Sequence, residues 1–150
     1  MFKLEYCNEK QRIYNFLLKN DDCFTPPLSE RINLKDYSGK LSSKGHNIFA
    51  YTEKDIGHAC FYINNSDKVS FLSSICVDDN FKGKILAKTI LREVELQLML
   101  IGVKELYLEV NWLNKRAISF YTKNGYIFVD RSNRNNSSRY MFKKLNRDIY

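Results

Sequence analysis

The segment at residues 77–126 most constrains the fold, because its hydrophobic pattern changes from strand to helix and back again. Apolar residues recur at spacings of four and three at Ala87, Leu91, Val94, Leu98 and Ile101. This spacing predicts a helix that buries one face, and the glycine at position 102 would end it. Residues 103–110 then alternate between apolar and polar side chains, which predicts a strand.

Further elements follow on both sides of this segment. Asn114 is the predicted N-cap of a shorter helix that stops at Gly125, and Asn33 is the predicted N-cap of an earlier one. The order of elements is β α α β β β α β α β β, which is typical of an α/β protein. The remaining predicted elements are a helix at residues 9–19 and strands at residues 2–6, 48–51, 58–63 and 69–77.

Composition and charge narrow the classes of function. A chain of 150 residues with 44% hydrophobic content suits one domain, residues 1–150. The net charge of +7 fits nucleic acid, anionic lipid or an anionic cofactor. Because Lys and Arg are spread along the chain without a long run, we expect no nucleic-acid partner. No apolar run approaches the length of a bilayer span, so we also expect no membrane partner.

The cysteine and histidine pattern indicates a reduced, metal-free protein. The four cysteines lie far apart without a Cys-x-x-Cys pair, and there are only two histidines. Neither a zinc site nor a disulfide framework follows from this pattern, and we expect a cytoplasmic location. His58 lies among apolar neighbours in a predicted strand, so packing in the core is favoured over catalysis.

A basic turn at residues 78–88 precedes the long helix. Backbone N–H groups at a helix start attract anionic oxygens, and Lys82, Lys84 and Lys88 add positive charge. A nucleotide P-loop is the rival interpretation, but it needs four residues between two glycines. Here three residues separate Gly83 from Ala87, so we set the P-loop aside.

Two motifs resemble signatures of the GNAT family of acetyl-CoA-dependent N-acetyltransferases. The basic turn is similar to the family's pyrophosphate loop, Arg/Gln-x-x-Gly-x-Gly/Ala, with Lys82 at the basic position and Ala87 at the last small one. Ile85 departs from the pattern, since it replaces the central glycine. Residues 108–126 are similar to the second signature, Leu-Glu-Val followed by Asn, Ala, Tyr and Gly-Phe at fixed offsets, with Gly125-Tyr126 at the last position.

The resemblance implies a fold and a set of residues that bind the acyl carrier. The implied fold is a single α/β domain with a mixed, mostly antiparallel, twisted sheet of about six or seven strands flanked by about four helices. Acetyl-CoA is the implied co-substrate, and no metal is implied. The residues implied to bind acetyl-CoA are Ile75, Val77, Lys82, Gly83, Lys84, Ile85, Leu86, Ala87, Lys88 and Asn114.

The resemblance also implies catalytic roles. Tyr121 stands where the family tyrosine donates a proton to the coenzyme A sulfur, although packing in the core is the alternative role for its ring. Glu109 is the candidate general base, acting directly or through water. No acidic residue lies in residues 71–77, so a water held by backbone carbonyls is the alternative base, and an exposed structural position is the alternative for Glu109.

The acceptor is the least constrained part of the hypothesis. We expect a primary amine on a small molecule, with an amino sugar as the favoured example, attacked directly in a ternary complex. The alternatives are a protein N-terminal or lysine acetyltransferase, and a non-catalytic domain that binds coenzyme A, which Ile85 favours. Pro26 and Pro27 either form part of the acceptor pocket or merely stiffen a loop. The chain is expected to be a monomer or a homodimer.

Overall fold

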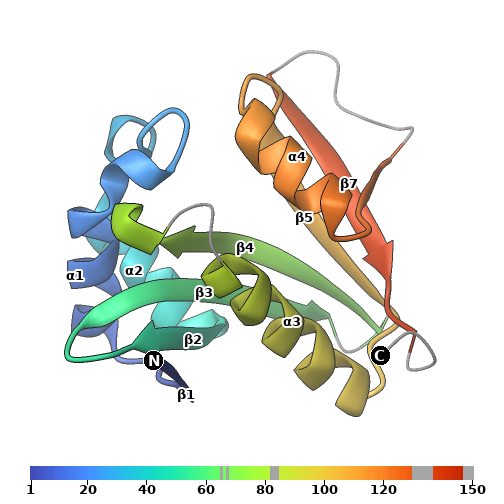
Figure 1. Ribbon diagram of the computed structural model, residues 1–150, viewed down its shortest axis with the longest axis horizontal. Coiled ribbons are helices and arrows are strands. Elements are labelled where there is room, and N and C mark those ends of the chain that lie inside the picture. Colours follow the sequence, from blue (N-terminus) through green and yellow to red (C-terminus); the bar gives the residue numbers. More distant parts are fainter. Residues whose placement is uncertain (65, 67, 82–84, 130–136, 147–150) are drawn as a thin grey trace.

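The computed structural model describes residues 1–64, 66, 68–81, 85–129 and 137–146. Within these residues the chain forms a seven-stranded sheet in the order β1-β2-β3-β4-β5-β7-β6, as Figure 1 shows. The predicted mixed α/β fold is confirmed. The strands are β1 (Lys3–Tyr6), β2 (His46–Tyr51), β3 (Asp55–Asn64), β4 (Val69–Val77), β5 (Glu105–Asn111), β6 (Ile127–Phe128) and β7 (Ser138–Lys144).

The helices cover the two faces of the sheet. Helices α1 (Lys10–Lys19) and α2 (Leu34–Lys44) pack on one face, and α3 (Ile85–Leu100) packs on the other, together with α4 (Lys115–Lys123). Strand β2 shows the division, because Ile48 and Ala50 belong to the core under α3, whereas Phe49 between them packs with α1 and α2. The alternation of a strand thus supplies both cores.

The pairing of β4 with β5 stops partway. The two strands pair in parallel from Val69 opposite Glu105 to Leu72 opposite Leu108, and no pairing follows. Figure 1 shows β4 and β5 diverging beyond that point. On its other side, β4 pairs with β3 through an irregularity that leaves Ser73 without an opposite residue. Such a bulge bends a strand, so the second half of β4 turns away from β5.

The predicted helix ends match the structure closely. The Asn33 side chain accepts a hydrogen bond from the Asp36 N–H at 3.0 Å, and Asn114 accepts one from the Ala117 N–H at 3.1 Å. Gly102 adopts the expected positive φ of 87°. The assignment of Ile101 to the buried face of the long helix was wrong. Helix α3 ends at Leu100, and the Ile101 side chain is 61% exposed.

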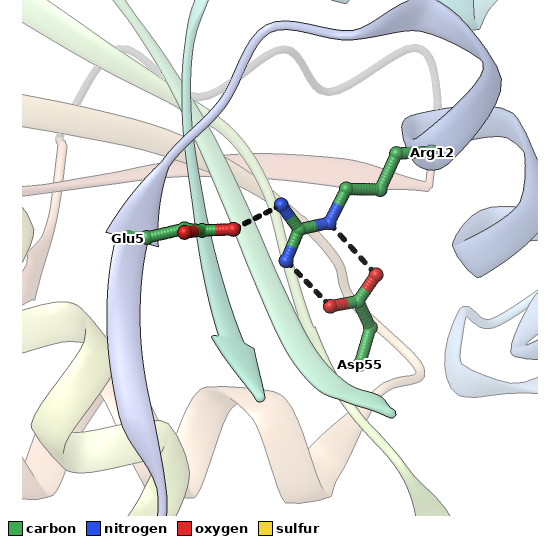
Figure 2. A network of polar contacts seen from close by, with 3 residues as sticks. All are labelled: Glu5, Arg12 and Asp55. Atoms are coloured by element: carbon green, nitrogen blue, oxygen red, sulfur yellow. Dashed lines mark hydrogen bonds and ion pairs between the residues drawn. The ribbon is translucent and has the colours of Figure 1, made fainter. Parts of the chain in front are cut away.

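An arginine ties α1 to two strands. Arg12 donates to both carboxylate oxygens of Asp55 on β3, at 2.9 and 2.7 Å, and also contacts Glu5 on β1 (Figure 2). Its guanidinium lies 4.2 Å from the centre of the Phe49 ring. A planar guanidinium suits this combination of a bidentate carboxylate contact and an aromatic face.

His58 is a core residue, as the sequence predicted. Its side chain is fully buried beside Phe16 and Phe49, and its Nε2 lies 2.8 Å from the Asn47 Oδ1. Burial lowers the pKa of His58 to about 3, and the charge of Arg12 adds to this effect while Asp55 opposes it.

This buried histidine makes stability depend on pH. Because the folded pKa is lower than the ordinary value of 6.5, the unfolded chain binds the proton more readily, and stability falls as pH drops from 6.5 toward 3. We expect the His58 contribution to the free energy of unfolding to drop by about 2 kcal/mol between pH 7 and pH 5. Urea titrations at both pH values would measure it. The His58→Gln variant should show a flatter profile, and an equally steep one would contradict the prediction.

Candidate active site

The separation of β4 from β5 opens a cleft of about 1030 Å³. Its walls are the unpaired ends of these two strands, the starts of α3 and α4, and the loop at residues 23–32. Because the strands no longer pair with each other there, their backbone N–H and C=O groups at this edge are available to a ligand. A bound chain that contains amide groups would satisfy them.

The cleft brings together most of the residues predicted to bind the acyl carrier. Leu86 differs, since its side chain is buried in the core under α3, so only its main chain remains for the predicted role. Lys82, Gly83 and Lys84 lie outside the described residues. The predicted binding residues that line the cleft are Ile75, Val77, Ile85, Ala87, Lys88 and Asn114.

The Ile85 side chain lies at the surface of the protein, at the start of α3. It is the first residue of α3, and 72% of its surface is exposed to solvent. It therefore contributes to the wall of the cleft while remaining largely in water. The effect of Ile85 on binding of the carrier stays a prediction.

The charges of the cleft are mostly positive. Lys88 on α3 and Arg116 and Lys123 on α4 line it from the helix side, and Arg31 lines it from the loop. Glu109 is the only acidic residue among the described residues that line it. This distribution favours a ligand that carries several negative charges, such as phosphates, near the helices.

Tyr121 lies in the cleft on α4. Its side chain is 9% exposed, and its ring packs edge to face against those of Phe120 and Tyr126. Burial, above all, and the nearby Cys23 thiol raise the pKa of Tyr121 above the ordinary phenol value. The phenol therefore keeps its proton at neutral pH, as a general acid requires.

Glu109 occupies a different environment. It is exposed on β5, opposite Tyr140 of β7, and it faces away from the core that Leu108 and Val110 fill. Glu109 and Asn111 both line the cleft. An exposed carboxylate at the cleft can accept a proton directly or through a water molecule.

Two further contacts at the cleft were not found from the sequence. The Tyr37 hydroxyl on α2 lies 2.8 Å from the Ser73 Oγ at the bulge of β4, and the Cys23 thiol donates to the Val77 carbonyl at 3.8 Å. The Tyr37 ring is partly buried against the core under α1 and α2, but spacing along the chain could not show the partner of its hydroxyl. These contacts hold the loop side of the cleft against β4.

No cluster of three metal-ligating side chains occurs among the described residues. Over the same ranges, no helix is both long and apolar enough to cross a membrane. All four cysteines are free thiols.

One cleft thus holds the start of α3, the unpaired edge of β4 and the buried phenol of Tyr121. The family model of the GNAT acetyltransferases matches residues 10–126. The chain therefore belongs to the GNAT family and is an acetyltransferase. No curated protein matches it in sequence.

Solved structures with the same fold align with almost the whole chain. The ribosomal-protein-S18-alanine N-acetyltransferase from Escherichia coli is 17% identical, with a TM-score of 0.76 over 100% of this chain and 99% of its own. A GNAT acetyltransferase from Staphylococcus aureus is 18% identical, with a TM-score of 0.76 over 97% and 100%. The PaiA N-acetyltransferase from Thermoplasma acidophilum, in complex with coenzyme A, is 18% identical, with a TM-score of 0.72 over 95% and 99%. At these identities the likeness shows the fold.

Proposed function

We propose that this protein transfers an acetyl group from acetyl-CoA to the primary amine of a small acceptor, by direct attack in a ternary complex. The observation that carries the proposal is the single cleft in which the start of α3, the free edge of β4, Glu109 and Tyr121 meet. Acetyl-CoA, when bound, supplies an activated thioester. Every other part of the chemistry is assigned to residues of this chain.

The cleft fits such a carrier in charge and in backbone chemistry. The unpaired edge of β4 at residues 73–77 offers main-chain groups to the amides of a pantetheine arm. Lys88 and the first N–H groups of α3 attract the phosphates. Asn114 accepts a hydrogen bond as the N-cap of α4, and it also lines the cleft.

Two side chains are assigned the proton transfers. Tyr121 holds its proton until the sulfur departs and then donates it. Glu109 accepts the proton that the attacking amine loses, directly or through water. The Val77 N–H is assigned to the thioester oxygen as the group that stabilises its developing charge.

The acceptor and the setting of the reaction are also proposals. The amino-sugar acceptor inferred from the sequence stays a prediction. The one-domain organisation of residues 1–150 and the monomeric or homodimeric state stay predictions too. The free cysteines accord with a reducing compartment, so a cytoplasmic location is part of the proposal.

Thermal unfolding tests the carrier assignment. A ligand that binds only the native state at 100 times its dissociation constant stabilises it by about 2.7 kcal/mol, which corresponds to roughly 5 to 10 °C for a chain of this size. We expect acetyl-CoA to produce such a shift and S-acetyl-pantetheine, which lacks the nucleotide phosphates, to produce a much smaller one. No shift with saturating acetyl-CoA would refute the carrier assignment. Release of the coenzyme A thiol with a panel of amines would then test the transfer itself.

A further inference from the structure

Four aromatic residues stand side by side across four strands of the sheet. Tyr62 of β3 lies opposite Phe71 of β4, Phe71 lies opposite Tyr107 of β5, and Tyr107 lies opposite Phe142 of β7. We call these four residues the aromatic row. With strands about 4.8 Å apart, the row is about 14 Å long.

The row points away from the core under α3. Its sequence neighbours Phe61, Leu72 and Met141 are buried in that core, so the alternation of each strand directs the row to the other face. Helices α1 and α2 cover that face over β2 and β3, and Lys40 of α2 lies near the ring of Tyr62. Tyr62 packs against the core under α1 and α2, whereas Phe71, Tyr107 and Phe142 do not belong to that core.

The rings of the row contact one another and remain partly exposed. The Tyr107 and Phe142 rings stack with their centres 5.2 Å apart and their planes 16° apart. All four side chains are of intermediate exposure. Aromatic surface left in water is unfavourable, and burying it against a ligand would be favourable. The partly exposed rings therefore offer apolar surface to a ligand.

A hollow of about 520 Å³ lies over the row. Tyr62, Phe71 and Tyr107 line it together with Tyr140 and Val129, and no charged side chain belongs to its described lining. A hollow of this size and composition suits an uncharged ring.

The hollow borders the cleft of the proposed reaction. Phe71 lines both of them. Glu109 is the next residue after Tyr107 on the same face of β5, and it lies opposite Tyr140 of β7. Residues two apart on one face of a strand are separated by about 6.6 Å. A molecule with its amine at Glu109 and its ring in the hollow would need a linker of only a few atoms.

We propose that the acceptor is a primary amine joined by a short linker to a flat, uncharged aromatic ring, and that the ring binds in the hollow over the aromatic row. This inference rests on the proposed function, since it names the class of acceptor for that site. It favours an arylalkyl amine over the amino sugar suggested by the sequence. Tyr107 and Tyr140 become specificity-determining residues under this proposal.

Steady-state kinetics with paired acceptors would test it. We expect kcat/KM for 2-phenylethylamine to exceed that for n-propylamine and for glucosamine by at least tenfold. Tyr107→Val should raise the KM for 2-phenylethylamine by about tenfold, a size typical of a lost aromatic contact, and should leave the KM for n-propylamine unchanged. Tyr6→Val, at an exposed position on β1, is the matched control and should change neither value.

A second variant and a binding measurement complete the test. Tyr140→Val should reproduce the selective loss if Tyr107→Val does not fold. Equal kcat/KM values for 2-phenylethylamine and n-propylamine, or a preference for glucosamine, would overturn the inference.

Calorimetry with the coenzyme A complex tests the ring site separately from the proposed acetyl transfer. Preferential binding of 2-phenylethylamine without turnover supports the hollow while the proposed function fails, and equal binding of both amines overturns the hollow.

Discussion

Replacing Tyr121 by phenylalanine is expected to lower turnover by about 100-fold or more, with little change in the KM for acetyl-CoA. The substitution removes one hydroxyl and keeps the ring that packs against Phe120 and Tyr126. The fold should therefore persist while the departing sulfur loses its proton donor. Thiol release at saturating substrates would measure the effect. Tyr14→Phe, on α1 and outside the cleft, is the matched control and should retain full turnover.

The pH profile adds a second readout for Tyr121. Because burial raises its pKa, the phenol stays protonated through the alkaline range in which an ordinary tyrosine begins to ionise. Tyr121 should therefore still act as a general acid at alkaline pH. We expect that its ionisation causes no decline in the kcat of the native protein below pH 10. Unchanged turnover in Tyr121→Phe would assign the ring to packing alone. A wild-type decline below pH 10 that disappears in the variant would contradict the raised pKa.

Local signals in the sequence predicted the elements and much of the site. The Asn114 side chain accepts a hydrogen bond from the N–H of Ala117, three residues later. Such capping depends only on neighbours along the chain. Tyr121 and Glu109 were placed by motif spacing, and the structure brings both into one cleft. The cleft itself was not predictable in this way. It depends on where the pairing of β4 with β5 stops and on the bulge at Ser73, which are properties of strand register.

The aromatic row shows the same limit. The alternation of β5 placed Tyr107 on the face opposite Leu106 and Leu108, and the structure confirms this placement. The sequence of one strand does not reveal which residues stand opposite it in the sheet. Only the pairing of Phe71 and Phe142 with Tyr107 turns a single aromatic residue into a surface.

A buried carboxylate on α3 was hidden by the helix pattern. Glu95 is the next residue after Val94, which belongs to the apolar stripe. The Glu95 side chain is only 1% exposed. The Tyr126 hydroxyl donates to it at 2.7 Å, and the Lys143 ammonium of β7 donates at 3.1 Å. The carboxylate thus joins α3 to β7 and to the residue that packs against Tyr121. The periodicity of a helix identifies buried positions, but it cannot show that a distant lysine makes one of them suitable for a charge.

Lys143→Met is expected to lower the free energy of unfolding by about 3 to 5 kcal/mol, since removing one partner of a buried ion pair leaves the other charge poorly compensated. The apolar stem of the lysine is largely replaced, so loss of the ammonium group dominates the effect. Urea unfolding followed by circular dichroism would measure the change. The double variant Glu95→Gln with Lys143→Met removes the charge while its amide oxygen can still accept from Tyr126, and it should recover most of the loss. If the double variant is as unstable as the single one, the cost lies in lost packing around Lys143, and the ion pair does not explain how α3 and β7 are held together.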